Sequence, residues 1–294
     1  MAAVAKVRPQ VVQISTGSGL GSGVIYDSAG DVVTNAHVVG SATTFTVHLV
    51  DGQQLAASLV GVYSPDDLAV IKLEGAKNIS AATFADSDAV QIGDIVFAVG
   101  NPLGLSSSVT DGIVSYNGRS VSEGNGVVLP STIQTSAAIN PGNSGGALVD
   151  LDGRVIGIPT LAAADQQLGG AAPGIGFAIP ANTVKLIAGQ LIGTGHVTRS
   201  DRAALDISAV DGVNASGQAV GAVVVELTPG GSAARAGIEA GELITAIGGR
   251  TVSSLADLQT VLAQMAPGQK VAVDVTSQTG VKRIVTATLS QLQG

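Results

Sequence analysis

Residues 139 to 148 read Ile139-Asn140-Pro141-Gly142-Asn143-Ser144-Gly145-Gly146-Ala147-Leu148, a glycine-crowded loop that runs directly into an apolar strand. Glycines allow backbone conformations that a Cβ would forbid, so main-chain N–H groups can converge beside the Ser144 hydroxyl. A serine hydroxyl is a weak nucleophile at neutral pH, and it needs a base to take its proton and donors to hold the resulting oxyanion. Because glycine-serine loops alone are common, this loop predicts catalysis only if the chain also supplies that base and an orienting acid.

The candidate bases are the three histidines of the chain, His37, His48 and His196. His37 stands where the apolar run at 32–33 gives way to small and polar residues, which suits a strand end that faces a cleft. His48 alternates with apolar neighbours and is expected in solvent, and His196 follows a glycine-containing linker. We therefore expect His37 to be the base. The alternative is a core histidine whose hydrogen bonds are satisfied.

The candidate acids are two adjacent carboxylates, Asp66 and Asp67, which precede the apolar run at 68–71. A carboxylate that directly abuts such a run can be drawn beneath the protein surface, where it accepts a hydrogen bond from an imidazole N–H. We expect Asp67 in this position and Asp66 to be a solvated turn residue.

These three segments, in this order, resemble the catalytic motifs of the HtrA/Deg family of trypsin-like serine proteases. The segments are Thr34-Asn35-Ala36-His37-Val38-Val39, Asp67-Leu68-Ala69-Val70-Ile71-Lys72-Leu73 and Gly142-Asn143-Ser144-Gly145-Gly146. Further matches are Gly21-Ser22-Gly23-Val24-Ile25 and Gly174-Ile175-Gly176-Phe177-Ala178-Ile179-Pro180. The resemblance covers residues 8 to 290 and implies a serine endopeptidase with His37, Asp67 and Ser144 as its catalytic triad.

The composition fits a folded, β-rich chain, with 45% hydrophobic residues, 12% charged residues and 40 glycines among 294 residues. A net charge of −8 offers no basic patch, which argues against nucleic acid as a partner. The absence of cysteine excludes disulfides and thiolate metal sites, and we expect neither a metal nor a cofactor. No apolar run reaches the roughly 18 residues that span a bilayer, and the first residues lack a signal-peptide pattern.

Short apolar segments between Gly, Asp and Ser residues predict a mainly β fold. The expected strands are 11–14, 22–26, 32–34, 44–49, 54–62 and 68–73 in one barrel, and 95–100, 107–116, 131–135, 147–150, 155–159 and 176–179 in a second. The resemblance implies that these strands form the chymotrypsin-like double β-barrel of the family, with the site expected in the cleft between the barrels. Residues 161–174 are expected to form a mobile loop beside that cleft, and a helix over 181–192 closes the domain.

The second part of the chain follows an α+β pattern and resembles a PDZ domain of the HtrA arrangement. The matching segments are Pro229-Gly230-Gly231-Ser232-Ala233-Ala234 and Gly241-Glu242-Leu243-Ile244. Ser254, with Asp257 three residues later, predicts a capped helix whose apolar face is more often core than groove. We expect a protease domain at 1–192, a linker at 193–202 and a PDZ domain at 203–294.

The resemblance also implies roles for individual residues. The oxyanion hole would use Gly142, Asn143 and Ser144, and the pocket before the scissile bond would use Ala138, Ile139, Thr160 and Leu161. This pocket contains no acid, so small aliphatic side chains should be preferred to Lys or Arg. Arg119, in an Asn-Gly-Arg loop, would relay peptide binding at the PDZ domain to the oxyanion loop. Its alternative is an ordinary solvated turn charge.

Peptide binding at the PDZ domain would involve Ala204, Leu205, Asp206, Ile207, Leu258 and Leu262 by resemblance. In this family, the loop that binds a C-terminal carboxylate carries a glycine where this chain has Asp206. A negative charge there predicts weak binding of carboxylates and tighter binding after Asp206→Gly. The alternative is that Asp206 points to solvent and the loop works normally.

The chain departs from the family pattern at several further places. Ser136 replaces a frequent acid, Pro159 replaces Asn in Gly-Ile-Asn-Thr and removes a backbone donor, and N-terminal aromatics that join trimers are not evident before Tyr26. The resemblance implies unfolded or misfolded protein substrates, peptides at the PDZ domain, and a homotrimer or higher oligomer. It also implies an extracytoplasmic location, whether periplasmic, cell-envelope or secreted. The alternative function is a catalytically latent, peptide-binding chaperone module.

Overall fold

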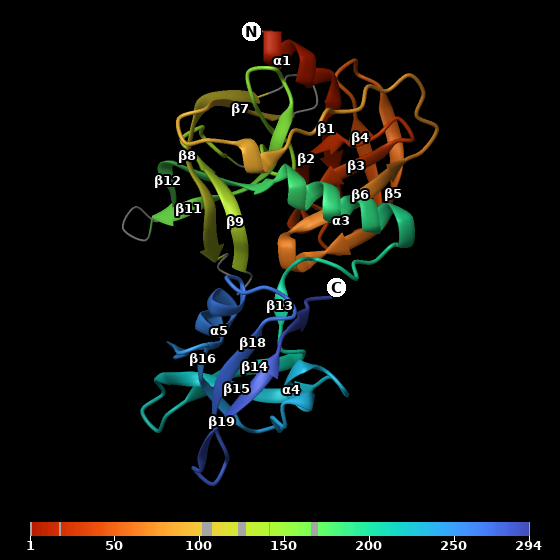
Figure 1. Ribbon diagram of the computed structural model, residues 1–294. Helices are drawn as coiled ribbons and strands as arrows, with labels where there is room; N and C mark the ends of the chain where they lie inside the picture. Colours follow the sequence, from red (N-terminus) through yellow and green to blue (C-terminus); the bar gives the residue numbers. More distant parts are fainter. Residues whose placement is uncertain are drawn as a thin grey trace. The chain divides into compact units, whose positions relative to one another are not determined.

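The computed structural model describes residues 2–17, 19–101, 108–122, 128–140, 142–165 and 170–293, without the side chains of 122, 161–165 and 170–173. The chain folds into two compact units (Figure 1). The first contains residues 1–119 and 131–197, and the second contains residues 120–130 and 198–293. Most of the regular structure in both units is β-strand, as the sequence predicts.

The first barrel of unit 1 is closed by six strands in the order β1-β2-β3-β6-β5-β4. They are β1 (Val11–Ser15), β2 (Leu20–Ile25), β3 (Asp31–Thr34), β4 (Thr44–His48), β5 (Gln54–Tyr63) and β6 (Leu68–Leu73). Their inward side chains, including Ile14, Val32 and Ile71, are fully buried. Period-2 alternation explains why β4 buries Phe45 and Val47 while Thr44 and Thr46 stay exposed.

The second barrel is closed in the order β10-β11-β12-β9-β8-β7. Its strands are β7 (Ile95–Gly100), β8 (Ser108–Ser122), β9 (Val128–Thr135), β10 (Ala147–Val149), β11 (Val155–Asp165) and β12 (Gly170–Pro180). The prediction of a loop at 161–174 is wrong for the residues that the structure describes, because Ala164 pairs with Ala171 and Asp165 pairs with Gly170 across β11 and β12. Cross-strand hydrogen bonds there outweigh the turn-like composition.

The helices of unit 1 are short except for the last. They are α1 (Ala2–Val7), η1 (Arg8–Gln10), α2 (Ala36–Val39), η2 (Ser64–Asp66), η3 (Ser87–Ala89) and α3 (Ala181–Thr194). The predicted helix at 181–192 is confirmed and runs two residues further, to a left-handed Gly195 that caps it. The helix contacts β5, β6 and β11, and it buries Val184, Ile187 and Leu191. Figure 1 shows it lying across the first barrel.

The described part of the second unit contains a six-stranded sheet, a two-stranded sheet of β13 and β20, and two helices. Its strands are β13 (Ala203–Ala204), β14 (Ile207–Val213), β15 (Ala219–Leu227), β16 (Leu243–Ile247), β17 (Arg250–Thr251), β18 (Lys270–Thr276), β19 (Lys282–Thr288) and β20 (Ser290–Gln291). The helices are α4 (Ser232–Arg235) and α5 (Leu255–Leu262). The predicted cap of α5 is confirmed: Ser254 Oγ accepts from Asp257 N at 3.1 Å, and Asp257 Oδ2 accepts from Ser253 N at 3.0 Å.

Candidate active site

His37 and Asp67 form a hydrogen-bonded pair in the structure. His37 Nδ1 lies 2.8 Å from Asp67 Oδ2, and the His37 backbone N–H donates to Asp67 Oδ1 at 2.9 Å. The histidine side chain is 46% exposed, whereas that of Asp67 is 4% exposed. His37 lies on the short helix α2 rather than at a strand end, since β3 finishes at Thr34. An imidazole that donates from Nδ1 to a carboxylate has Nε2 as its basic nitrogen.

Asp67 is held by its backbone as well as by its side chain. It follows η2 in a left-handed conformation, with φ 50° and ψ 41°, and its carbonyl accepts from Ala36 N and Asn35 Nδ2, each at 3.0 Å. The expectation that Asp66 is solvated is wrong, because Asp66 is only 2% exposed. The 3-10 turn folds both carboxylates under the barrel surface, and only Asp67 is turned toward His37.

Ser144 lies in a loop whose peptide planes are fixed by hydrogen bonds. Gly146 N donates to Asn143 O at 2.9 Å, and Gly145 N donates to Pro159 O at 3.0 Å. Gly142 and Gly145 have φ values of 104° and 80°, which an L side chain adopts only with strain. A Cβ on Gly145 would lie 2.2 Å from Ser22 O. Glycine is therefore required at this position for the loop to reach β2.

The three predicted oxyanion residues differ in what the structure shows. The carbonyl of the Asn143–Ser144 peptide faces Gly146, so the Ser144 N–H points the opposite way. Asn143 donates from its backbone to Asn140 O at 3.0 Å and from its side chain to Ala138 O at 3.2 Å. Asn143 thus positions the loop in this conformation. The Gly142 N–H belongs to the peptide with Pro141, which lies outside the described residues.

Thr160 joins the acid to the nucleophile, a connection that the sequence alone does not reveal. Its Oγ1 donates to Asp67 Oδ2 at 2.5 Å, and its carbonyl accepts from Ser144 Oγ at 3.0 Å. In the β11–β12 ladder, Pro159 pairs with Ala178 and Leu161 with Phe177, so Thr160 is the extra residue of a bulge. Bulges re-aim side chains and tolerate proline, which explains both Thr160 and the neighbouring Pro159. The Thr160 side chain is buried and contacts the acid.

The other predicted pocket residues have different surroundings. Ala138 is exposed, and its carbonyl accepts from Thr110 Oγ1 at 2.8 Å. Ile139 is only 5% exposed and packs in the core of the second barrel. A Cβ on Gly176 would lie 2.3 Å from Ile139 Cγ1, so that glycine leaves room for the isoleucine. Leu161 belongs to β11, and its side chain is outside the described part.

The other two histidines and Arg119 lie on secondary structure elements or after them, with the following exposure and contacts. His48 is half-buried in β4 and His196 is exposed after α3. Arg119 lies in β8 rather than in a loop, and its guanidinium stands 4.9 Å from the Tyr116 ring centroid. Its carbonyl accepts from Thr132 Oγ1 at 2.7 Å.

Much of the predicted PDZ groove belongs to the core of the second unit. Leu205 and Leu258 are 1% and 2% exposed and pack within one cluster, and Ala204 is 6% exposed. Ile207 and Leu262 are partly buried against the same cluster. Among the six predicted residues, Leu258 is therefore a core position of α5, and Leu262 and Ile207 keep some exposed surface.

Asp206 has internal partners, which neither interpretation of the sequence anticipates. Its Oδ2 accepts from Ser232 N at 2.7 Å and its Oδ1 from Ser290 Oγ at 2.6 Å. Its φ is 57°, a left-handed value that Asp tolerates better than most residues. The expectation that Asp206 points freely to solvent is wrong, because its carboxylate joins the β13–β14 loop to α4 and β20.

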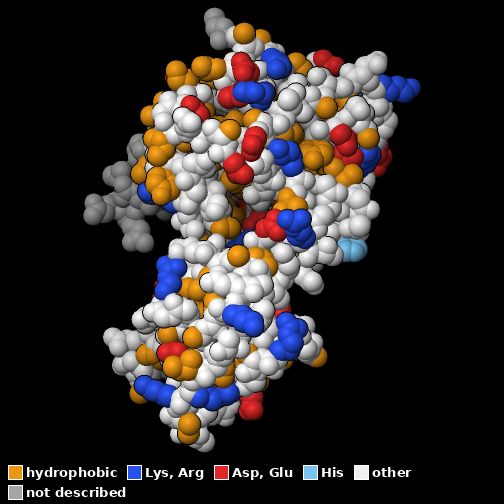
Figure 2. Space-filling model, in the orientation of Figure 1, with side chains coloured by type: hydrophobic (Ala, Val, Ile, Leu, Met, Phe, Trp, Pro, Cys, Tyr) orange, Lys and Arg blue, Asp and Glu red, His pale blue; other side chains and the backbone are white. Residues whose placement is uncertain are grey.

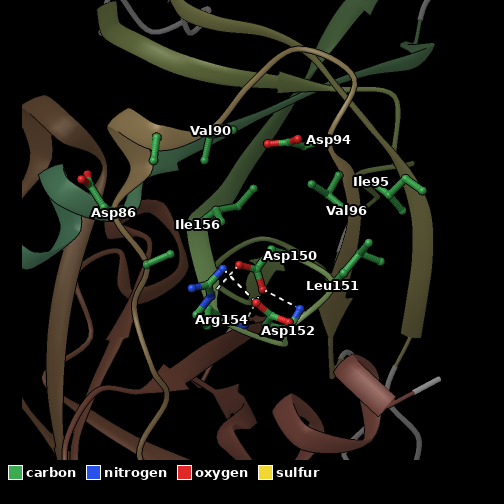
Figure 3. Close-up of a pocket in the computed structure, with 12 residues that line it drawn as sticks. Asp86, Val90, Asp94, Ile95, Val96, Asp150, Leu151, Asp152, Arg154 and Ile156 are labelled. Atoms are coloured by element: carbon green, nitrogen blue, oxygen red, sulfur yellow. Dashed lines mark hydrogen bonds and ion pairs between the residues drawn. The ribbon is translucent and has the colours of Figure 1, made fainter.

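A pocket of about 320 Å³ lies elsewhere on the second barrel (Figure 3). Val90, Val96 and Ile156 supply an apolar lining, and no proposed triad residue lines it. Arg154 forms ion pairs with Asp150 at 2.8 Å and with Asp152 at 3.0 Å.

Within the described ranges, no cluster of three or more His, Cys, Asp or Glu side chains could hold a metal ion. No helix of the described chain is long and apolar enough to cross a membrane.

Comparison with known proteins is consistent with this geometry. Residues 21–158 match the trypsin-like peptidase domain, and residues 223–276 match the PDZ domain. The chain is 44% identical over 256 residues to the periplasmic serine endoprotease DegP of Escherichia coli (strain K12), covering 85% of this chain and 53% of DegP. It is 41% identical over 260 residues to the periplasmic pH-dependent serine endoprotease DegQ of the same strain, covering 86% of this chain and 55% of DegQ.

Solved structures extend the likeness over both units. The HtrA-type protease AlgW with decapeptide superimposes with a TM-score of 0.66 and 32% identity, covering 99% of this chain and 98% of that one. The serine endoprotease from Yersinia pestis gives a TM-score of 0.65 at 32% identity, covering 99% and 97%. The chain therefore belongs to the HtrA/Deg family of trypsin-like serine proteases with a PDZ domain. It spans about half the length of DegP and DegQ.

Proposed function

We propose that this chain is a serine endopeptidase that cleaves unfolded or misfolded proteins. The observation that carries the proposal is the His37–Asp67 pair, held by two hydrogen bonds of 2.8 and 2.9 Å, in the unit that also holds Ser144 within its glycine loop. Its family membership and the endoprotease names of DegP and DegQ support the same activity.

In the proposed mechanism, Ser144 Oγ attacks a peptide carbonyl while His37 Nε2 accepts its proton and later donates it to the leaving amine. Asp67 holds the Nδ1–H tautomer and stabilises the imidazolium. A hydroxyl has one proton, and here it is donated to Thr160 O at 3.0 Å. The first step therefore requires the Ser144 hydroxyl proton to be redirected from Thr160 O to His37.

The proposed oxyanion donors are the backbone N–H groups of Gly142 and Ser144. The fixed Asn143–Ser144 peptide supports the second of these, because its N–H is turned away from Gly146. Loss of one such donor costs about a hundred- to thousandfold in turnover, since it acts where charge develops in the transition state. The conformation of residues 142–144 would thus control activity.

The proposal is tested by labelling with a fluorophosphonate probe and by cleavage of unfolded casein. We expect the parent chain to be labelled and to cleave casein, and Ser144→Ala and His37→Ala to lose cleavage. Both variants should stay within about 1–2 kcal/mol of the parent in unfolding free energy, because neither residue is a large apolar core position. Substantial cleavage by purified Ser144→Ala would refute the assignment.

A catalytically latent, peptide-binding chaperone module is the second candidate. The observation that favours it is that the Ser144 hydroxyl donates its hydrogen bond to the Thr160 carbonyl and not to His37. Absence of labelling, together with suppression of casein aggregation, would support this candidate. Labelling that requires a bound peptide would instead indicate a protease whose loop is activated by its ligand.

We further propose a protease domain at 1–192, a linker at 193–202 and a PDZ domain at 203–294. In this proposal the PDZ domain binds peptides that regulate the protease, and Arg119 relays that signal.

The names of DegP and DegQ place those proteins in the periplasm, which supports an extracytoplasmic location here. Lys and Arg side chains are interspersed with acidic and uncharged ones on the face in Figure 2, consistent with protein rather than nucleic-acid partners.

We propose self-association into a trimer or higher oligomer through the second barrel. Ile95 and Ile113, paired across β7 and β8, are 50% and 43% exposed, and Leu151 is 59% exposed. Ile95 and Leu151 both line the pocket in Figure 3, so apolar surface gathers there. Light scattering should give a mass above one chain, and Ile95→Lys should lower it. A monomeric parent chain would refute self-association.

A further inference from the structure

Ser22 is a buried serine that connects the first barrel to the loop of the proposed nucleophile. It lies in β2 opposite Gln13 and is fully buried. Its hydroxyl donates to Gly142 O at 2.5 Å and accepts from Asn101 N at 2.8 Å. One hydroxyl therefore joins β2, the residue after β7 and the glycine loop.

The backbone of Ser22 holds the same loop at a second point. Its N–H donates to Ser144 O at 3.0 Å, and its own carbonyl accepts from Thr34 Oγ1 at 2.7 Å. Ser22 thus binds the carbonyls of Gly142 and Ser144, on either side of Asn143. The Gly142–Asn143 peptide is held at both ends, because its N–H donates to Asn140 O at 3.0 Å.

The Gly142–Asn143 peptide that Ser22 holds lies between the two peptides that carry the proposed oxyanion donors, the N–H groups of Gly142 and Ser144, so it constrains both from between them. A peptide plane whose carbonyl is bound by a fully buried hydroxyl cannot rotate without breaking that bond. Glycine at 142, with φ 104°, otherwise has wide conformational freedom. A side chain that removes this freedom preorganises the donors before charge develops, which is how such sites gain catalytic power.

We propose that Ser22 is a positioning residue that holds the oxyanion loop in its catalytic conformation through the Gly142 carbonyl. This inference rests on the proposed endopeptidase function. Ser22 takes no part in the bond changes, and it acts through the loop alone. Its loss should therefore lower turnover and leave substrate binding nearly unchanged, because oxyanion donors act in the transition state.

The test compares Ser22→Ala with Ser87→Ala. Ser87 is also a buried serine of unit 1, at 2% exposure, and its hydroxyl accepts a backbone N–H, that of Asn182, at 3.1 Å. This bond joins η3 to α3 rather than to the glycine loop, so Ser87→Ala controls for the loss of a buried hydroxyl. We would measure kcat and KM on a peptide taken from a mapped casein cleavage site, inhibition by a matching peptide boronic acid, and thermal unfolding.

We expect Ser22→Ala to lower kcat at least tenfold, to keep KM within about twofold, and to weaken boronate inhibition by a factor similar to that in kcat. Ser87→Ala should keep all three within about twofold. A folded Ser22→Ala variant with parent-like kcat, or with a raised KM and unchanged kcat, would overturn the inference.

If Ser22→Ala does not fold, Ser22→Cys provides the measurement. A thiol is a weaker donor and acceptor than a hydroxyl, so a several-fold loss of kcat is expected and an unchanged kcat overturns the inference. Fluorophosphonate labelling of the parent chain reports on the proposed function separately. An active parent beside an equally active Ser22→Ala variant removes only the role of Ser22.

Discussion

Replacing Thr160 with valine should separate the orientation of the acid from the chemistry of the nucleophile. Thr160 Oγ1 donates to Asp67 Oδ2 at 2.5 Å, and the Thr160 side chain is buried. Valine preserves the branched shape and removes only the donor. The carbonyl of residue 160, which accepts from Ser144 Oγ, is retained because it belongs to the backbone.

The expected size of the effect follows from the bonds that remain. A hydrogen bond to a charged group contributes about 1.5–3 kcal/mol, and about 1.4 kcal/mol corresponds to a tenfold change in rate. Asp67 keeps the two bonds from His37, at 2.9 and 2.8 Å, so the imidazole stays oriented to a large extent. We therefore expect kcat/KM to fall about tenfold and the unfolding free energy to fall by about 1–3 kcal/mol.

The assay is cleavage of casein and the rate of fluorophosphonate labelling, both well below the melting temperature of each variant. Thr160→Ser is the matched control, because it retains the hydroxyl and loses one buried methyl group. Its activity should stay within about threefold of the parent. Equal rates for Thr160→Val and Thr160→Ser would refute the reasoning, since the hydroxyl would then have no effect on the proposed triad.

Three further predictions concern specificity, the PDZ unit and pH. Casein fragments should end mostly in Val, Ala or Ile, because the buried Ile139 and its surroundings offer no acid to a basic side chain; fragments ending mostly in Lys or Arg would contradict this. Asp206→Gly should lower the stability of the second unit by about 1–2 kcal/mol in urea unfolding, because two hydrogen bonds outweigh the relief of a left-handed backbone. The sequence-based hypothesis adds tighter binding of an apolar C-terminal peptide, and unchanged stability and affinity would remove both statements. Burial raises the pKa of Asp31 above its value of about 3.9 in the unfolded chain. Because the folded state then binds this proton more tightly than the unfolded state does, the unfolding free energy decreases as the pH rises above about 3.9. The stability of Asp31→Asn relative to the parent should therefore rise in thermal melts as the pH increases above about 3.9, and a constant difference would show that Asp31 is not responsible.

The sequence by itself determined the features that depend on neighbouring residues. Alternating apolar residues predicted the strands of both barrels, and Ser254 with Asp257 predicted the start of α5, because these signals arise within one turn or one strand. The family motifs, in their order, identified His37, Asp67 and Ser144 as the candidates for chemistry. Each of these statements requires only residue type and spacing.

The tertiary structure decided which groups meet across long distances in the chain. The Thr160 hydroxyl reaches Asp67 across 93 positions, and the Ser22 hydroxyl reaches Gly142 across 120. Adjacent carboxylates at 66 and 67 are both buried, and only the left-handed backbone of Asp67 gives it a different direction. These partnerships depend on barrel closure, on the β11 bulge and on cross-strand register. Local periodicity contains no information about them, because each arises from packing between segments that are distant in sequence.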